Sequence, residues 1–297
     1  MSATYDRYRN VPLTPPNQAP PALRYPWPEG NRAAMFLSFD IDAESAWTGK
    51  DPSHADRLVT MSFGGFEARV GTPVILKLLR EMGLKATFFI TGWAVEAHPA
   101  MAEAVLADGH EIGHHGYHHL IPEPGADHML EELDYGLEVL KRRLGVVPVG
   151  YRAPIGEASA ELCQSLRERN FLYTSSWFDD VRPYRHVMKD GSPGLIELPQ
   201  TTSYDDWMHG LANRFSPRSI FPKEHVLSMW RDDLDETRAW GDLVTTVFHP
   251  QVSGRPMRFR LLREFLQYTV SCNDVWITTG EEIARYYEQQ EKALAVS

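Results

Sequence analysis

The chain has few cysteines and no long apolar run. It holds 297 residues, of which only Cys163 and Cys272 are cysteines, too few for the disulfide framework of a small secreted protein. No window approaches the ~20 consecutive apolar residues of a transmembrane helix. The first residues, MSATYDRYRNVPLTPP, lack the apolar segment that secretory signals carry. We therefore expect a cytoplasmic protein that does not bind membranes.

Basic residues are also in the minority. Lys and Arg number 30 against 40 Asp and Glu, giving a formal net charge of -10. An acidic surface repels phosphate backbones, so nucleic-acid binding is disfavoured. No expected strand is followed by G-x-G-x-x-G or G-x-x-x-x-G-K-[ST], so nucleotide binding has no support either.

The sequence predicts one short arm and one domain. Residues 1–30 are rich in proline and read as an extended N-terminal arm, and residues 31–297 read as a single domain. Strands are expected at 33–39, 87–90, 111–113, 149–153, 171–175, 195–198, 243–248 and 275–278, and helices at 72–82, 99–108, 128–144, 160–169, 224–240, 259–269 and from 279. This alternation predicts an α/β fold with a mainly parallel sheet, either a barrel, possibly distorted, or a doubly wound open sheet. Residues 178–223 read as long loops over one end of the sheet.

Histidines are concentrated in GHEIGHHGYHH, residues 109–119, which contain five of the twelve in the chain. If this stretch turns helically, His115 and His119 lie on one face, and His114 and His118 form a second such pair. Neutral imidazole is a ligand for Zn, Co, Ni or Fe. The stretch therefore predicts a metal site, with a histidine-rich surface loop as the alternative.

Two aspartates follow the first expected strand in SFDIDAE, residues 38–44. Side chains two positions apart on a strand point to the same side, so Asp40 and Asp42 should leave the strand together. Like charges this close resist joint ionisation unless a cation or an arginine intervenes. Since a site with two histidines usually adds a carboxylate, this pair is the candidate, and a helix cap with a solvated partner is the alternative.

Two further candidates follow later strands. Arg152 in GYRAP, residues 150–154, could pair with one of the aspartates and hold it ionised. His249 in TTVFHP, residues 245–250, directly follows a buried strand. All these groups fall at the carboxyl ends of strands, the face that carries the site in α/β folds.

Four segments of the chain resemble, in their order, the motifs of the polysaccharide deacetylase family, the NodB-homology group of metal-dependent C–N hydrolases. These segments are SFDID, HHGYHH, YRAP and FHP. The resemblance covers residues 33–285. Within this family the closer match is a cytosolic branch. It includes peptidoglycan-deacetylase-like proteins, metal-independent PuuE-type allantoinases and cyclic imide hydrolases. Its marks are DIDAESAW (40–47), EARVGTPVILKLL (67–79), KATFFITG (85–92), GHEIGHHGYHH, SPRS (216–219) and HPQVSGRP (249–256). The departures are the D-I-D spacing, His118 in place of Ser or Thr, and Ile155 in place of an aromatic residue.

The resemblance implies a distorted (β/α) barrel that hydrolyses amide-type C–N bonds outside peptides. The metal ligands it implies are Asp42, His115 and His119, around one divalent ion, zinc first, with Co, Ni, Fe or Mn as alternatives. It implies that Asp40 is the catalytic base, that Arg152 orients this base, and that His249 is the general acid. It also implies a homo-oligomer, for which we expect a tetramer.

We expect the substrate to be a small cyclic amide or imide, because no leader is visible and the proline-rich loops suit a covered pocket. The residues that could bind it are Trp47, Glu157, Trp177, Asp180, Tyr184 and Tyr204. The first alternative is N-deacetylation of a peptidoglycan or chitooligosaccharide unit. The second is a catalytically silent metal-binding assembly protein, which the intact Asp40 and His249 disfavour.

Overall fold

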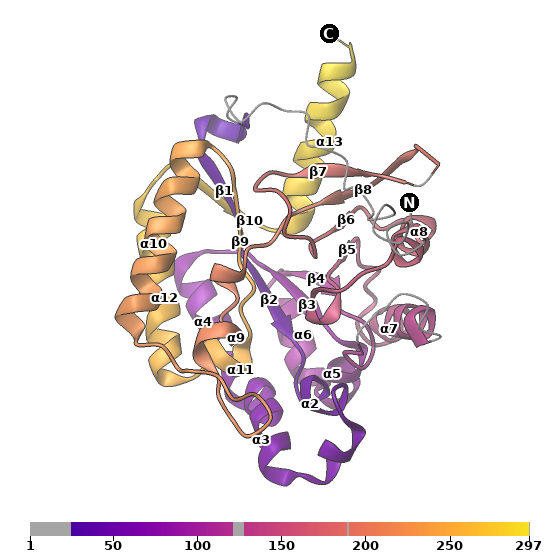
Figure 1. Ribbon diagram of the computed structural model, residues 1–297, viewed down its shortest axis with the longest axis vertical. Helices are drawn as coiled ribbons and strands as arrows, with labels where there is room; N and C mark the ends of the chain where they lie inside the picture. Colours follow the sequence, from indigo (N-terminus) through magenta and orange to yellow (C-terminus); the bar gives the residue numbers. More distant parts are fainter. Residues whose placement is uncertain (1–24, 121–127, 189, 297) are drawn as a thin grey trace, which may run out of the picture.

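The computed structural model describes residues 25–120, 128–188 and 190–296 (Figure 1). Most of the predicted N-terminal arm therefore lies outside the described residues. Its last part is anchored on the helix α13 (Gly280–Val296), where Tyr25 stacks on Tyr287 with ring centroids 6.4 Å apart. Trp27 Nε1 also donates a hydrogen bond to the carbonyl oxygen of Gly241 at 2.9 Å.

The strands form two sheets that are parallel apart from one pairing. The smaller has the order β10 (Val275–Thr278), β1 (Ala33–Phe36) and β9 (Leu243–Thr245). The larger has the order β2 (Ser38–Ile41), β3 (Thr87–Ile90), β4 (Glu111–His114), β5 (Gly150–Tyr151), β6 (Tyr173–Thr174), β8 (Pro193–Glu197) and β7 (Tyr184–Val187). Among the pairings between these strands in the described part of the chain, only β7–β8 is antiparallel. A parallel bridge between Phe39 and Phe248 links the sheets, and the predicted class, a distorted α/β barrel, is confirmed.

Helices surround the strands. They are α2 (Ser45–Thr48), α3 (Leu58–Phe66), α4 (Thr72–Met82), α5 (Gly92–Ala97), α6 (Pro99–Ala107), α7 (His128–Leu144), α8 (Ala160–Glu168), α9 (Trp207–Gly210), α10 (Lys223–Trp240), α11 (Pro250–Ser253), α12 (Pro256–Ser271) and α13. In Figure 1, α10 and α12 pack together on the left, and α7 and α8 lie on the right. None of the helices in the described ranges is long and apolar enough to cross a membrane.

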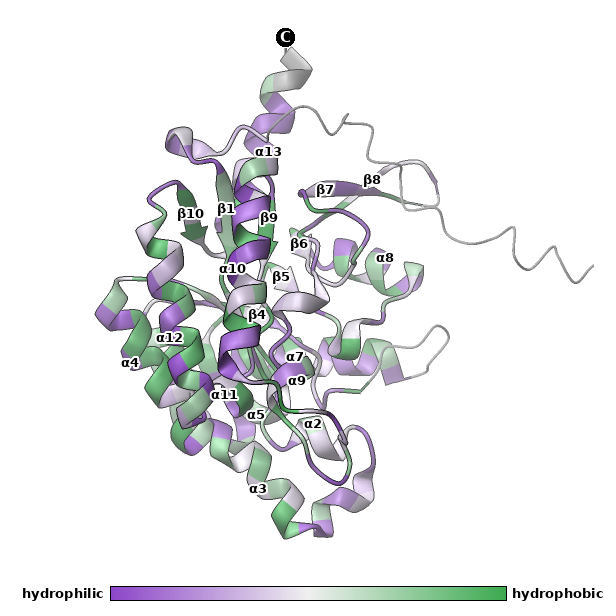
Figure 2. Cartoon of the chain, turned by 60° about the vertical axis from the view of Figure 1, so that its left-hand side comes forward, coloured by the Kyte–Doolittle hydropathy of each residue, from purple (hydrophilic) through white to green (hydrophobic). Residues whose placement is uncertain are grey.

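The first predicted strand, 33–39, is divided at Leu37 into β1 and β2. Both are buried along their whole length, and Figure 2 shows β1 in the green of hydrophobic residues. Strands that are covered on both faces read as continuous apolar runs, which is why this segment was recognisable from sequence. Phe39 in β2 is stacked on Phe88 at 5.0 Å and tilted against Phe248 at 5.8 Å between ring centroids.

Two predictions about local structure need correction. The helix predicted at 72–82 is found there as α4, but it does not start separately, because helical backbone runs on from α3 through a π-helical turn, Glu67–Gly71, into α4. A Cβ atom at Gly71 would collide with the carbonyl of Pro250, so this turn packs directly on α11. Residues 178–223 are not only loops, since they also hold β7 and α9. Pairing with β8 stabilises β7, and such a long-range partner is invisible to local patterns.

Because Phe39 lies between two aromatic neighbours in the core, we expect Phe39→Ala to lower the free energy of unfolding by ~3–5 kcal/mol. The matched control is Phe178→Ala, since Phe178 is 52% exposed and its loss should change that free energy by no more than ~0.5 kcal/mol. Urea unfolding of both variants measures the difference. Equal costs would contradict this description of the core.

Candidate active site

A cavity of about 210 Å³ opens at the carboxyl ends of the central strands. The side chains predicted as ligands or catalytic groups all line it, namely Asp40, Asp42, His115, His119, Arg152 and His249. Their relative exposure ranges from 1% for Arg152 to 8% for His249, so these polar groups are almost completely withdrawn from water. The structure thus brings together four segments that are distant in the sequence.

Asp42, His115 and His119 form a tight group. Asp42 Oδ1 lies 3.5 Å from Nε2 of His115 and 3.6 Å from Nε2 of His119. These separations are too long for hydrogen bonds, and Asp42 Oδ1 is buried without a hydrogen-bond partner. Ligand atoms about 2.1 Å from a tetrahedral ion would lie about 3.4 Å from one another. The group therefore fits a divalent ion, and an imidazole and carboxylate donor set suits zinc and its neighbours in the first transition row.

The two imidazoles converge through a loop, so the prediction of a helical turn is wrong. Strand β4 ends at His114, and the backbone then takes positive φ angles at Gly116 (+73°) and His119 (+56°). His115 Nδ1 donates a hydrogen bond to the carbonyl oxygen of Arg152 at 2.8 Å. This bond fixes the tautomer and leaves the lone pair of Nε2 directed at Asp42, as in metal sites where a second ligand shell orients the histidine.

The alternative pair, His114 and His118, has other partners. His114 Nε2 donates to the carbonyl oxygen of Leu133 at 3.1 Å, and its Nδ1 accepts from Gly116 N at 3.0 Å. His118 Nε2 lies 2.9 Å from Thr48 Oγ1. These two residues fold the loop around the site, and the structure selects His115 and His119 from the four.

Asp40 pairs with Arg152, which is held from three sides. Arg152 Nη1 donates to Asp40 Oδ1 at 2.6 Å, and its Nη2 and Nε donate to Ser175 at 3.1 and 3.2 Å. The guanidinium also lies over the ring of Phe89, 4.3 Å from its centroid. Burial alone would raise the pKa of Asp40, but the charges of Arg152, His115 and His249 lower it below its ordinary value. Asp40 is therefore ionised at neutral pH.

His249 is held by Asp206. Its Nδ1 lies 2.8 Å from Asp206 Oδ1, and its backbone N–H donates to the same carboxylate at 3.0 Å. Ser253 Oγ also donates to Asp206. Burial would lower the pKa of His249, but the hydrogen bond and charge of Asp206, followed by Asp205 and Asp42, raise it to about 10. The imidazole is therefore protonated at neutral pH and able to give up a proton.

Three functional candidates were not selected from the sequence. No local sequence pattern links Asp206 to His249, which lies 43 residues away. Lys50 and Arg218 line the pocket as well, and neither stands at the end of a strand. The SPRS segment, residues 216–219, was the one sequence signal that pointed to Arg218.

The prediction of the substrate-binding residues needs correction. The pocket lining does not include Trp47, Glu157, Trp177, Asp180, Tyr184 or Tyr204. Tyr204 is fully buried in the core, where its hydroxyl donates to the carbonyl oxygen of Trp230 at 2.9 Å. The Tyr184 hydroxyl donates to Asp179 at 2.8 Å. Trp47 is also fully buried and donates to Gln251 Oε1 at 2.8 Å.

The remaining three predicted residues belong to the right segments but face elsewhere. Asp180 accepts from the backbone N–H of Val181 at 2.7 Å, and Trp177 packs on His186 at 4.5 Å between ring centroids. Glu157 is exposed. Their neighbours Ile155, Gly156 and Phe178 line the pocket instead. Side-chain direction in irregular segments depends on backbone angles that composition does not reveal.

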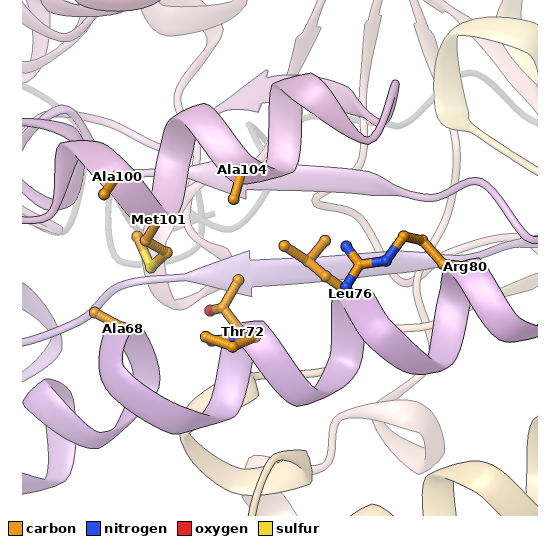
Figure 3. Close-up of a pocket in the computed structure, with 8 residues that line it drawn as sticks. Ala68, Thr72, Leu76, Arg80, Ala100, Met101 and Ala104 are labelled. Carbon is orange, nitrogen blue, oxygen red and sulfur yellow. The ribbon is translucent and has the colours of Figure 1, made fainter.

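A second cavity, of about 280 Å³, lies between α4 and α6 (Figure 3). Its lining is small or apolar apart from Thr72 and Arg80, and Arg80 is paired with Asp108. It offers no acid, base or nucleophile, so the pocket at the strand ends is the candidate active site.

Comparisons with known proteins give a consistent result. The family signature described as polysaccharide deacetylase matches residues 52–173. A solved structure from Mycobacterium smegmatis assigned to the polysaccharide deacetylases is 36% identical, with 92% of this chain and 96% of that chain aligned and a TM-score of 0.86. The peptidoglycan deacetylase of Helicobacter pylori is 28% identical over 270 residues, 82% of this chain and 92% of its own. The structure of PuuE allantoinase has the same fold, with a TM-score of 0.78 at 23% identity over 92% of this chain and 95% of its own.

If Asp42, His115 and His119 hold an ion, His115→Ala should abolish stoichiometric metal binding because it removes one of three ligands. His118→Ala is the matched control, since it removes a histidine from the same loop whose ring contacts Thr48 instead. Elemental analysis after dialysis, with zinc titration calorimetry, measures both. Retention of the ion by His115→Ala, or its loss from His118→Ala alone, would refute this ligand set.

Because Asp206 is the chief cause of the raised pKa of His249, Asp206→Asn should lower that pKa from about 10 towards ~6.5. Asp205→Asn should lower it less, because Asp205 lies 3.8 Å from Nδ1. Titration of the His249 ring followed by NMR gives both values. An unchanged pKa in Asp206→Asn would show that another group sets it.

Proposed function

Because the chain belongs to the polysaccharide deacetylase family, we propose that it is a metal-dependent hydrolase of amide-type C–N bonds outside peptides. One observation carries this proposal. A three-residue set that fits a divalent ion shares one buried pocket with an ionised carboxylate on Arg152 and a protonated imidazole on Asp206. Amide hydrolysis needs a base for water and an acid for the departing nitrogen, and the pocket supplies both.

Asp42, His115 and His119 are the residues that would hold the ion. A divalent ion in such a set supplies a Lewis acid that polarises a carbonyl and acidifies water. Asp40 takes a proton from the attacking water through Oδ2, since Oδ1 is occupied by Arg152 Nη1. Arg152 keeps this carboxylate ionised and in a fixed orientation.

His249 donates the second proton. Its Nδ1 is bound to Asp206, so Nε2 is the ring atom available to protonate the leaving nitrogen. Asp206 stabilises the charged ring, and Ser253 holds Asp206 in place. The pKa of about 10 means that the ring carries its proton before the reaction begins. Each of these proton transfers contributes ~10²–10⁴ in rate.

The proposed substrate is a small cyclic amide or imide, such as a hydantoin-, dihydropyrimidine- or succinimide-like ring. The size of the cavity, about 210 Å³, supports this because pockets for drug-sized ligands hold ~300–1,000 Å³. The exposed apolar side chains of Ile155, Phe178 and Met208 surround its entrance and would cover the faces of a ring. A structural neighbour is also described as an allantoinase, whose substrate by name is a small ring compound.

N-deacetylation of a peptidoglycan or chitooligosaccharide unit is the second candidate. It is favoured by the name of the Helicobacter pylori relative, a peptidoglycan deacetylase that matches 82% of this chain. An acetamide group is small enough to enter the same cavity, and the same base and acid would serve. Zinc as the native ion, a cytoplasmic location and a homotetramer stay predictions.

An assay of succinimide and hydantoin against an N-acetylglucosamine oligomer, with and without chelator, separates the two candidates. We expect chelator-sensitive ring opening without release of acetate. Asp40→Asn should retain the metal and lose turnover by ~10²–10⁴, since it removes the proton acceptor but no ligand. Acetate release without ring opening would favour deacetylation, and loss of the metal from Asp40→Asn would mean that the two aspartates have exchanged roles.

A further inference from the structure

Two positive side chains in the pocket have no carboxylate partner. Arg152 pairs with Asp40 and His249 pairs with Asp206, whereas Lys50 and Arg218 also line the cavity. Across residues 25–120, 128–188 and 190–296, no carboxylate lies within 4.0 Å of either. Positive charge without a partner beside a binding cavity indicates the sign of the ligand.

Lys50 is held at the pocket by aromatic rings. Its Nζ lies 5.4 Å from the ring centroid of Trp47 and 5.3 Å from that of Trp207, a cation–π arrangement that limits where the ammonium can move. The preceding Gly49 packs beneath the histidine loop, since a Cβ there would lie 2.6 Å from the carbonyl oxygen of His118. The side chain of Lys50 is exposed to solvent at the pocket, where partial desolvation and the charge of Arg218 lower its pKa and the charge of Asp42 raises it.

Arg218 reaches the pocket from the segment after α9. Its Nη1 contacts Sδ of Met208 at 2.7 Å, and Met208 lines the entrance. The positive charge of this guanidinium disfavours the charged form of Lys50. An anion bound between the two side chains would offset this repulsion. The fork of an arginine also binds a carboxylate through two parallel hydrogen bonds.

The carboxylates of the pocket do not need these two cations. Asp40 and Asp206 already have partners, and Asp42 belongs to the set that fits a divalent ion. Asp205 lies 3.8 Å from Nδ1 of His249. Lys50 and Arg218 therefore form no ion pair with the carboxylates of the pocket.

We propose that Lys50 and Arg218 form an anion subsite that binds a carboxylate substituent of the substrate, so that the preferred substrate is a small ring amide or imide with an acidic side group. The ring part of this inference rests on the proposed function. The small volume of the cavity, about 210 Å³, favours a carboxylate over a larger anion. The charged group would also orient the ring, since it fixes one end while the bond to be broken faces Asp42 and the two histidines.

Matched pairs of rings test the subsite. Hydantoin and hydantoin-5-acetic acid, and dihydrouracil and dihydroorotate, differ within each pair by one carboxyl-bearing group. In the wild-type protein we expect the charged member to bind at least about tenfold more tightly by calorimetry, the effect of one charge-assisted hydrogen bond, with the same preference in kcat/KM. Lys50→Gln and Arg218→Gln should each reduce the ratio of the two affinities towards one.

Arg214→Gln is the control. Arg214 lies in the same segment, over the ring of Phe215 at 5.4 Å, and it does not line the pocket. This variant should keep the wild-type ratio. No preference in the wild type, or a preference that survives both substitutions, overturns the subsite. The first of these outcomes is measured on the wild-type protein and therefore does not depend on the folding of a variant.

The same data separate this inference from the proposed function. If both members of a pair are opened equally, the result supports the proposed ring hydrolysis and contradicts the anion subsite. If the charged rings bind preferentially but no ring is opened, the result supports the subsite and contradicts the proposed ring hydrolysis.

Discussion

The burial of two carboxylates at the end of one strand is the constraint on which the rest of the site depends. Asp40 and Asp42 are 3% and 2% exposed, and neither could stay charged there without compensation. Arg152 serves both. Its guanidinium binds Asp40, and its carbonyl oxygen orients His115 towards Asp42. One residue thus links the base to the ligand set, and the hydrogen bonds from Arg152 to Ser175 extend this link to β6.

The backbone around the site is strained where the charges converge. Ala43, His119 and Ile155 have positive φ angles, which non-glycine residues adopt at a cost and which persist where surrounding contacts fix them. At Ala43 the fixing contact is Glu67, a fully buried residue of the π-helical turn, which accepts from Ala43 N and, at 3.3 Å, from Gln251 N. Glu67 therefore holds the loops that carry Asp42 and His249 against each other.

The charged groups of the pocket have different tasks. Paired charges hold a base and an acid in opposite protonation states, Asp40 ionised and His249 protonated, which is the separation that proton-transfer catalysis requires. Lys50 and Arg218 line the same pocket, and they are the two groups that we propose bind an anionic part of the substrate. The fold is shared with an allantoinase at 23% identity, so the chemistry of a family member depends on such local groups more than on the barrel.

The amino-acid sequence by itself determined the class of fold and the polar groups at the strand ends, because buried parallel strands are continuous apolar runs and their carboxyl ends meet at one edge. It also determined helices with strong periodicity and clear ends, such as α7, predicted at 128–144 and found there. Only the tertiary structure decided that His115 and His119 face the site while His114 and His118 do not, that Asp206 holds His249, and that Tyr204 belongs to the core. These outcomes depend on positive φ angles and on partners tens of residues away, which local sequence patterns do not encode.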